Sequence, residues 1–415
     1  MRRLGGRLGL LALGLIVAEG SLWLLCALVP EAAARLSGFK PRYVADSAIG
    51  VRGDPQLPEY DEAGFRNAVR PRRATIVAIG DSQTEGNGVA REHAWPQRLA
   101  QILNVDIYQL AFGGYGPGEY RVLLDDALSL DPELILVGIY AGNDFADAYN
   151  WVYVDGRDPD LVATDAAIHR GITHAEEERG PLAHWSEETR YAKKSLAGSR
   201  MRRWLHVNRE RSKLVSLWQQ LTWNLEHGGT WREGDREPDS WSEVRAIASR
   251  SDPSLLLPFE SKGVKTVFTP RARRSVVDTG DPRIAEGLRL SVDLLRDMAH
   301  RVDGRARMAV VSIPTKELAF SARVAQVGEP APVALTELVA AERSARQQLA
   351  AALDASGIHL IDALTTLETT VADGRNPYPA DWDGHPNAVG HDAIARAVAA
   401  AVATEHASIA SVLAR

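Results

Sequence analysis

The feature that most constrains the fold is a regular alternation of short apolar runs with longer amphipathic stretches. This alternation indicates βαβ units, in which helices join parallel strands. It predicts an α/β protein, a three-layer α/β/α sandwich around a mostly parallel, doubly wound sheet. The expected strands are 75–79, 105–110, 134–140, 308–313 and 358–361, and the expected helices lie near 94–103, 118–130, 283–302, 334–356 and 388–404.

The alternation stops between about 145 and 271. This stretch contains a basic helical segment at 193–225. It also contains seven tryptophans, namely Trp151, Trp185, Trp204, Trp218, Trp223, Trp231 and Trp241. We therefore expect a largely helical, Trp-rich insert within one domain that spans 74–404, followed by a C-terminal tail at 405–415.

The N-terminus begins with arginines that precede a long apolar segment. At about 1.5 Å per residue, this segment is long enough to cross a bilayer core. It predicts a cytoplasmic tail at 1–7, a transmembrane helix at 8–29 and a linker at 30–73. The positive-inside rule then places the remaining body on the periplasmic or extracytoplasmic side of the inner membrane. A cleaved signal peptide is the alternative, with the alanines at 32–34 as its cleavage site.

Charge and cysteine usage exclude several classes of function. The net charge is -6, from 48 Lys and Arg against 54 Asp and Glu, which argues against a general nucleic-acid binder. The single cysteine, Cys26, lies in the predicted transmembrane helix. An intramolecular disulfide, a Cys-rich zinc site and a cysteine-pair redox motif are therefore impossible. We expect neither a metal nor a cofactor, and the chemistry must rest on other side chains.

Four short motifs follow predicted strands or precede the last helix. Ser82 comes directly after the first strand, Gly114 after the second and Asn143 after the third, while His385 precedes the final helix. The carboxyl ends of parallel strands meet at one edge of a sheet, where open α/β sheets bind ligands. Serine needs a base and oxyanion-stabilising donors to act as a nucleophile at neutral pH. A Gly-Asp-Ser triplet alone is also an ordinary helix start, so the interpretation depends on the whole set.

In this order the four motifs resemble the SGNH (GDSL-type) hydrolase family. The resemblance covers about 74–404, apart from the insert. The segment 61–67 is similar to bacterial family members that carry a membrane anchor, and 313–317 is similar to a segment in membrane-associated relatives that modify exopolysaccharides. The resemblance implies a flavodoxin-like SGNH fold and an ester hydrolase with a serine nucleophile.

The resemblance also implies roles for individual residues. Ser82 would be the nucleophile, and His385 would be the general base and then the general acid. The oxyanion hole would consist of the Ser82 and Gly114 N–H groups and the Asn143 side chain.

Two further assignments follow less directly from the resemblance. The orienting acid of the family usually lies three residues before the histidine, but Trp382 occupies that position here. Asp383, two residues before, is expected to take the role, with Asp381 as the alternative. Lys316 would face the cleft and bind an anionic or sugar substrate, and a solvated lysine is the simpler interpretation of the same residue.

These inferences together predict a serine esterase that removes a small acyl group, with acetyl as the expected group. Its substrate would be a carbohydrate of the cell envelope or the extracellular space, and the intermediate would be acyl-Ser82. The alternatives are an O-acyltransferase for the same substrates, a lipase or thioesterase, and a non-catalytic glycan-binding envelope protein. The expected partners are the ester substrate and the membrane, without nucleic acid.

Overall fold

The computed structural model describes residues 2–28, 43–180, 182, 214, 241–327 and 330–413. The chain divides into two compact units, Met1–Ala45 with Lys193–Arg232 and Asp46–Ala192 with Glu233–Arg415. Most of what is described of the first unit is helix α1 (Arg2–Leu28). Among the described residues, none of the helices has the length and hydrophobicity needed to cross a bilayer. Residues 8–28 of the predicted transmembrane helix are helical, but a membrane span is not supported there.

Helix α1 contains a polar interruption at its centre. Trp23 Nε1 donates to Glu19 Oε1 at 3.0 Å, one helical turn away. The backbone N–H of Leu214 donates to Glu19 Oε2 at 3.0 Å. Ser21 Oγ donates to the carbonyl of Val17 at 2.8 Å. The carboxylate in the middle of the apolar run thus has hydrogen-bond partners within its own unit.

The second unit is built on a sheet that has five parallel strands in the part of the chain that the structure describes. Its strand order is β4-β3-β5-β8-β9, which numbers 2-1-3-4-5 along the chain, an order of doubly wound folds. The predicted α/β class with a parallel sheet is confirmed. The strands are β3 (Ile76–Gly80), β4 (Ile107–Ala111), β5 (Leu134–Tyr140), β8 (Arg307–Ile313) and β9 (His359–Asp362), each within two residues of its predicted bounds.

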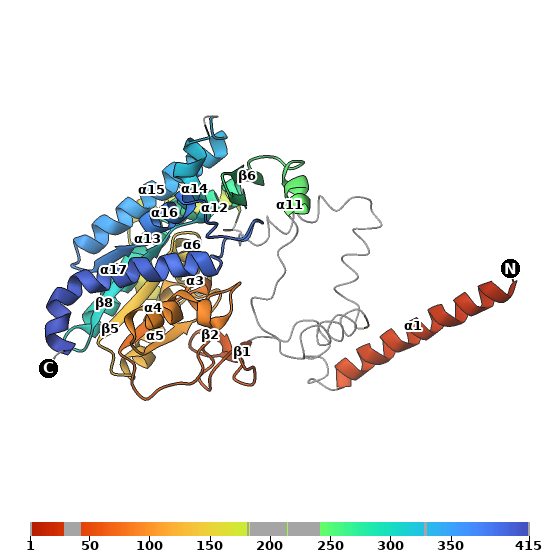
Figure 1. Ribbon diagram of the computed structural model, residues 1–415, viewed down its shortest axis with the longest axis horizontal. Helices are drawn as coiled ribbons and strands as arrows, with labels where there is room; N and C mark the ends of the chain where they lie inside the picture. Colours follow the sequence, from red (N-terminus) through yellow and green to blue (C-terminus); the bar gives the residue numbers. More distant parts are fainter. Residues whose placement is uncertain are drawn as a thin grey trace. The chain divides into compact units, whose positions relative to one another are not determined.

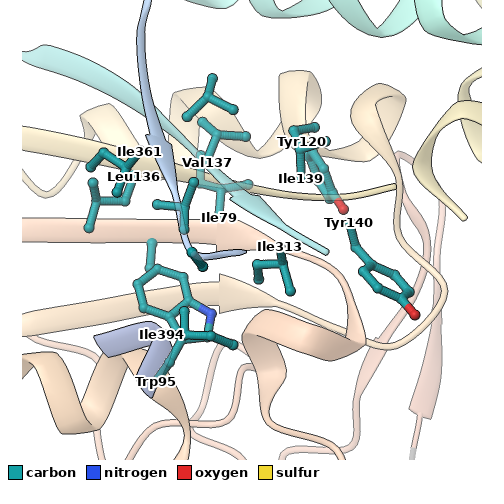
Figure 2. Packing of buried hydrophobic residues seen from close by; sticks show 14 of the residues in the cluster. Ile79, Trp95, Tyr120, Leu136, Val137, Ile139, Tyr140, Ile313, Ile361 and Ile394 are labelled. Carbon is teal, nitrogen blue, oxygen red and sulfur yellow. The ribbon is translucent and has the colours of Figure 1, made fainter. Parts of the chain in front are cut away.

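The central strands are apolar because helices cover both faces of the sheet. All residues of β3 and β5 are buried, as is typical of parallel strands between two helical layers. The edge strand β9 is short and exposes His359 and Asp362. Figure 2 shows Ile79, Val137 and Ile313 in this core, from three neighbouring strands.

The long helices of the second unit form two layers over the sheet (Figure 1). On one face, α4 (Trp95–Leu103) packs against α17 (Ala388–Leu413), and α17 in turn contacts α16 (Leu364–Ala372). On the other face, α13 (Pro282–Val302) contacts both α5 (Pro117–Leu128) and α15 (Val333–Asp354). Trp95 and Ile394 therefore reach the core from α4 and α17, as Figure 2 shows. The right-handed crossovers of parallel βαβ units explain this division between the faces.

The described part of the insert is not purely helical. It contains α6 (Asp144–Tyr149), which continues as a π-helical turn at Asn150–Val154, then Pro159–Leu161, α7 (Ala166–Arg179) and α11 (Trp241–Ala248). A hairpin of β6 (Leu257–Ser261) and β7 (Val264–Phe268) follows. Its turn residues Lys262 and Gly263 both have positive φ, which matches the twist of two-residue hairpins.

Several predicted features lie outside the described residues. These are most of the basic segment at 193–225, residues 30–42 of the linker, the C-terminal residues 414–415, and Trp185, Trp204, Trp218, Trp223 and Trp231. The remaining described elements are β1 (Tyr43–Asp46), β2 (Gly50–Gly53), α3 (Ser82–Glu85), the turn Arg91–His93, α12 (Pro270–Val277) and α14 (Lys316–Ala325).

The segment before β3 is tied to the domain by buried polar side chains. Arg66 donates to the carbonyls of Gly86 at 2.7 Å and Val89 at 2.8 Å. Asn67 donates to the carbonyl of Gln109 at 2.9 Å and accepts from its N–H at 3.0 Å. These contacts join the segment both to the edge strand β4 and to the turn that follows Ser82.

Candidate active site

Ser82 is the first residue of the short helix α3, immediately after β3. Asp81 caps the helix, because its Oδ1 accepts from the N–H of Gln83 at 2.9 Å. Gly86 ends the helix in the left-handed conformation, with φ of +84°. The serine is thus held at the carboxyl edge of the central strand, where the chain turns sharply from strand to helix.

Helix α3 can lie this close to the sheet because two strand positions carry no side chain. A Cβ placed at Gly80 of β3 would lie 2.1 Å from Thr84 Oγ1, and one at Gly138 of β5 would lie 2.4 Å from it. Both distances are far below van der Waals contact. Thr84 therefore fills the space over two neighbouring strands and fixes the height of Ser82 above the sheet edge.

The structure brings Ser82, His385 and Asp383 together in one hydrogen-bonded row. Ser82 Oγ lies 2.9 Å from His385 Nε2, although the two residues are 303 positions apart. His385 Nδ1 lies 2.6 Å from Asp383 Oδ1. The side chains of His385 and Asp383 are 16% and 26% exposed, so a substrate can reach the row. Serine, imidazole and carboxylate in this order form the arrangement that activates a serine hydroxyl.

The charges of the row determine its proton positions. Burial raises the pKa of Asp383, but the charge and hydrogen bonds of His385 outweigh it and hold that pKa well below the usual value. Asp383 is therefore an acceptor, and His385 Nδ1 carries the proton between them. Burial lowers the pKa of His385, whereas the charge of Asp383 raises it, with a net rise above 6.5. Neutral His385 then presents Nε2 as an acceptor to the Ser82 hydroxyl.

The carboxylate that faces His385 belongs to Asp383, two residues before it. Asp383 Oδ1 also accepts from the backbone N–H of His385 at 3.0 Å, so one oxygen closes a tight turn. Asp381, the alternative in the sequence, has another contact. Its Oδ1 accepts from the backbone N–H of Asp383 at 2.8 Å. The two aspartates thus form consecutive turns, and only the second contacts the imidazole.

The predicted oxyanion donors come from the turns after β4 and β5. Gly114 is exposed with φ of +92°, and a Cβ there would meet nothing within 4 Å. Its neighbour Gly113 donates its N–H to Glu85 Oε2 at 2.7 Å. A Cβ at Gly113 would lie 3.7 Å from the Cβ of Ser82, so this turn borders the serine.

Asn143 is held by carboxyl groups. Its Nδ2 donates to Asp147 Oδ2 at 2.7 Å and lies 3.4 Å from Asp144 Oδ1. A hydrogen bond from the Asn143 side chain also lowers the pKa of Asp81, next to Ser82. The amide is thus placed beside the serine turn, and it must share its N–H groups between these carboxyls and any developing oxyanion.

Burial raises the pKa of the carboxyls around Asn143. It raises the pKa of Asp147 to about 8, against the hydrogen bond from Asn143. It also raises the pKa of Asp81 to about 6 and that of Asp144 well above its usual value. Asp144 is further fixed by the hydroxyl of Tyr120 at 2.9 Å. At neutral pH Asp147, which binds the Asn143 amide, is therefore mostly protonated, whereas Asp81 is mostly ionised.

Lys316 does not lie where the sequence suggested. Its side chain is fully buried at the start of α14, instead of facing a cleft or the solvent. Its Nζ donates to the carbonyl of Asp381 at 2.9 Å and to that of Asp383 at 3.0 Å. The apolar neighbours Leu318, Ala319 and Phe320 indicate a buried helix start. They are the signal that could have corrected the prediction.

Sequence reasoning missed two residues of the site. Asp147 holds the Asn143 amide, and Glu85 holds the turn at Gly113 while accepting from the hydroxyl of Tyr60 at 3.1 Å. The signal for Asp147 is its spacing of one helical turn from Asn143. Glu85 lies inside the serine motif but resembles an ordinary helix residue.

No protein-family model matches the chain, and no curated protein matches it. Similar solved structures include a carbohydrate esterase family 2 enzyme plus carbohydrate-binding domain from Corynascus thermopiles (Myceliophthora fergusii), at 13% identity and a TM-score of 0.27, covering 81% of this chain and 68% of that one. A second is phospholipase A1 from Streptomyces albidoflavus NA297, at 11% identity and a TM-score of 0.32, covering 79% of this chain and 98% of that one. A third is an extracellular lipase from Streptomyces rimosus, at 13% identity and a TM-score of 0.32, covering 78% of this chain and 97% of that one. Scores this low do not establish a function, which must be inferred from the site itself.

Proposed function

We propose that the chain is a serine ester hydrolase of the SGNH type, with Ser82 as nucleophile, His385 as base and Asp383 as the orienting acid. One observation carries the proposal. The atoms Ser82 Oγ, His385 Nε2, His385 Nδ1 and Asp383 Oδ1 form an unbroken row with contacts of 2.9 and 2.6 Å. A merely structural serine at a helix start has no need of this row.

The reaction follows from the proton positions. His385 Nε2 takes the hydroxyl proton as Ser82 Oγ attacks the ester carbonyl, and Asp383 stabilises the imidazolium. The carbonyl oxygen becomes negative within reach of the N–H groups of Ser82 and Gly114 and the amide of Asn143. His385 then protonates the leaving alcohol, which leaves an acyl-Ser82. Water, deprotonated by His385, attacks this ester and releases the acid.

The substrate within this proposal is a carbohydrate ester with a small acyl group, such as acetyl. Its support is the resemblance of 61–67 and 313–317 to anchored relatives that modify exopolysaccharides. The extracytoplasmic location stays a prediction, made from the N-terminal arginines and the apolar segment that follows them.

The test uses p-nitrophenyl acetate and the purified full chain. We expect steady turnover with an acetyl group on Ser82 detected by mass spectrometry after acid quenching. Ser82→Ala should remove the Ser82 adduct and nearly all turnover, because the hydroxyl that forms the acyl-enzyme is gone. Equal turnover by Ser82→Ala would contradict the proposal.

A second assay concerns the acyl group. We expect p-nitrophenyl acetate and acetylated polysaccharide to be hydrolysed faster than long-chain p-nitrophenyl esters. A strong preference for long chains would overturn the small-acyl assignment and favour a lipase, while leaving the serine mechanism intact.

A further inference from the structure

We propose that Lys316 is a positioning residue, which fixes the loop 381–385 through its backbone carbonyls so that Asp383 can orient His385. This inference rests on the proposed serine mechanism and adds a residue that the sequence motifs do not contain. Lys316 touches no reacting atom. It acts through the loop that carries the acid and the base.

Lys316 binds the backbone on both sides of a single residue, Trp382. Lys316 Nζ donates to the carbonyls of Asp381 and Asp383 at 2.9 and 3.0 Å, which flank Trp382. An ammonium group has three N–H donors and no acceptor, so it can bind two carbonyls at once. Both carbonyls thus accept from the start of α14, while the carboxylate of Asp383 contacts His385.

The loop needs such support because its turn is short. The carboxylate stands two residues before the histidine, and its Oδ1 accepts from both the N–H and the Nδ1 of His385. A small rotation of the Asp383 peptide would break both contacts together. Buried carbonyls in an irregular loop also require donors. The Asp381 carbonyl has further donors in β7, namely the N–H of Val267 at 3.2 Å and Thr266 Oγ1 at 3.4 Å.

The helix start that carries Lys316 is itself held by hydrogen bonds. Thr315 caps α14 by accepting from the N–H of Leu318 at 3.3 Å. The N–H of Thr315 donates to Glu342 Oε1 of α15 at 2.9 Å. Lys316 therefore extends from a helix start that is anchored to a neighbouring helix, and its position is set independently of the loop.

A fully buried lysine is costly unless its charge and donors are used. Burial lowers the pKa of Lys316 to about 8, while the carboxylates of Glu317, Asp381 and Asp383 oppose this shift. An apolar residue of similar volume would avoid the desolvation cost entirely. A lysine at this position is explained if its N–H groups are required. Both carbonyls that it binds belong to the loop 381–385.

The experiment compares Lys316→Met with Arg323→Met in the full chain. Arg323 is a matched control, because it is a buried cation on the same helix that donates to Gln326 and the carbonyl of Lys262, away from the row. Two readouts are made: kcat and KM for p-nitrophenyl acetate, and the NMR titration of His385 with its Nδ1 proton resonance. The second readout needs no turnover, so failure of the esterase proposal would not affect it.

For Lys316→Met we expect kcat to fall about 100-fold with KM changed less than about twofold, because the acid is displaced by a fraction of an ångström to one ångström. The pKa of His385 should fall and the Nδ1 resonance should disappear, since the contact with Asp383 raises the former and produces the latter. Arg323→Met should alter neither readout, even if it lowers thermal stability as much as Lys316→Met does.

Three results would overturn the proposal. The first is an unchanged kcat and Nδ1 resonance in folded Lys316→Met. The second is a higher KM at constant kcat, which would mean that Lys316 binds substrate. The third is a rise in the pKa of His385 with the Nδ1 resonance retained, which would mean that Lys316 acts through its charge alone.

Lys316→Gln covers the case in which Lys316→Met does not fold. Its amide keeps N–H donors without the charge, so we expect a folded chain that retains the Nδ1 resonance and at least about a tenth of wild-type kcat. A folded Lys316→Gln that loses the resonance as completely as an Asp383→Ala chain would also count against the proposal.

Discussion

The two sides of the serine differ in how they handle charge. On the side of the base, the carboxylate of Asp383 keeps its negative charge, because the charge and hydrogen bonds of His385 lower its pKa. On the side of the predicted oxyanion donors, burial raises the pKa of Asp147, which binds the Asn143 amide, to about 8. Negative charge is thus kept beside His385, whereas Asp147 beside Asn143 is mostly protonated at neutral pH. This asymmetry is what acyl transfer through a serine requires.

The two sides also differ in how they are built. The oxyanion side consists of turns that directly follow β4 and β5, so its residues are fixed by the ends of the two strands that flank β3. The base side depends on long-range contacts, in which Lys316 and the β7 residue Val267 bind the loop from elsewhere in the chain. The first region is therefore a local product of the sheet, and the second is assembled by tertiary packing.

The largest effect should come from Asp383→Asn. An amide at this position would favour the wrong tautomer of His385 and remove the charge that stabilises the imidazolium, so we expect kcat to fall about 10,000-fold. Asp381→Asn is the control, because its Oδ1 can still accept from the N–H of Asp383. Steady-state kinetics with p-nitrophenyl acetate would measure both. Similar losses for the two variants would show that the assignment of the acid is wrong.

On the other side, Asn143→Ala should cost less. Removing one oxyanion donor reduces kcat about 100-fold to 1000-fold, while the N–H groups of Ser82 and Gly114 remain. The pH dependence of kcat/KM on the acid side should be unchanged, since His385 is not touched. Full activity in Asn143→Ala would mean that its amide stays bound to Asp147 throughout and never reaches the oxyanion.

Asp147→Asn tests whether activity depends on Asp147 being uncharged beside Asn143. Above pH 8 the wild-type Asp147 ionises next to the oxyanion donor, so we expect kcat to fall about fivefold by pH 9.5. The variant should keep its kcat over this range, because its side-chain oxygen still accepts from Asn143 but never becomes charged. A pH-rate profile of both proteins provides the measurement. An equal fall of kcat between pH 8 and 9.5 in the two proteins would contradict the role given to Asp147.

The same group predicts a stability effect with a defined sign. The folded-state pKa of Asp147, about 8, lies above its usual value of 3.8, so the folded chain holds a proton that the unfolded chain releases. Its contribution to stability is therefore present at low pH and is lost as pH rises from about 4 through 8. Thermal unfolding should show that Asp147→Asn loses less stability than wild type across this window.

The smallest effect is expected for Gly114→Ala. At φ of +92° a side chain strains the backbone by about 1 kcal/mol, although its Cβ would meet no atom. We expect kcat to fall about threefold as the N–H shifts. Gly304→Ala is matched to it, with φ of +72° and equal space, in the loop before β8. Gly304→Ala should lose similar stability and no activity. Equal losses of kcat in the two variants would mean that Gly114 has no specific role in the site.

Much of this arrangement can be predicted from the sequence. The apolar runs at 75–79 and 134–140 indicated buried parallel strands, and the residues after such strands share one edge. The grouping of Ser82 with His385 and Asp383 was implied by the resemblance to SGNH hydrolases, with Asp381 as the alternative acid. Their catalytic roles, and those of Gly114 and Asn143, stay predictions.

The remaining features could not be read from local patterns. The contacts of Lys316 with the 381–385 loop join residues 65 and 67 positions apart and depend on how α14 packs. A lone lysine after a strand looks the same in sequence whether it is solvated or buried. The β6–β7 hairpin was missed because its strands are short and lie in a stretch with no clear period. The apolar run at 8–29 was assigned to a membrane from hydropathy alone.

The central claim is that Ser82 is a nucleophile activated by His385. It is tested most directly by treating the full chain with a fluorophosphonate, which reacts with activated serines, and measuring the intact mass. The account predicts one adduct per chain, located on Ser82 by peptide mapping, with no adduct in Ser82→Ala and strongly slowed labelling in His385→Ala. An unlabelled wild-type chain, or labelling that persists in Ser82→Ala, would contradict it.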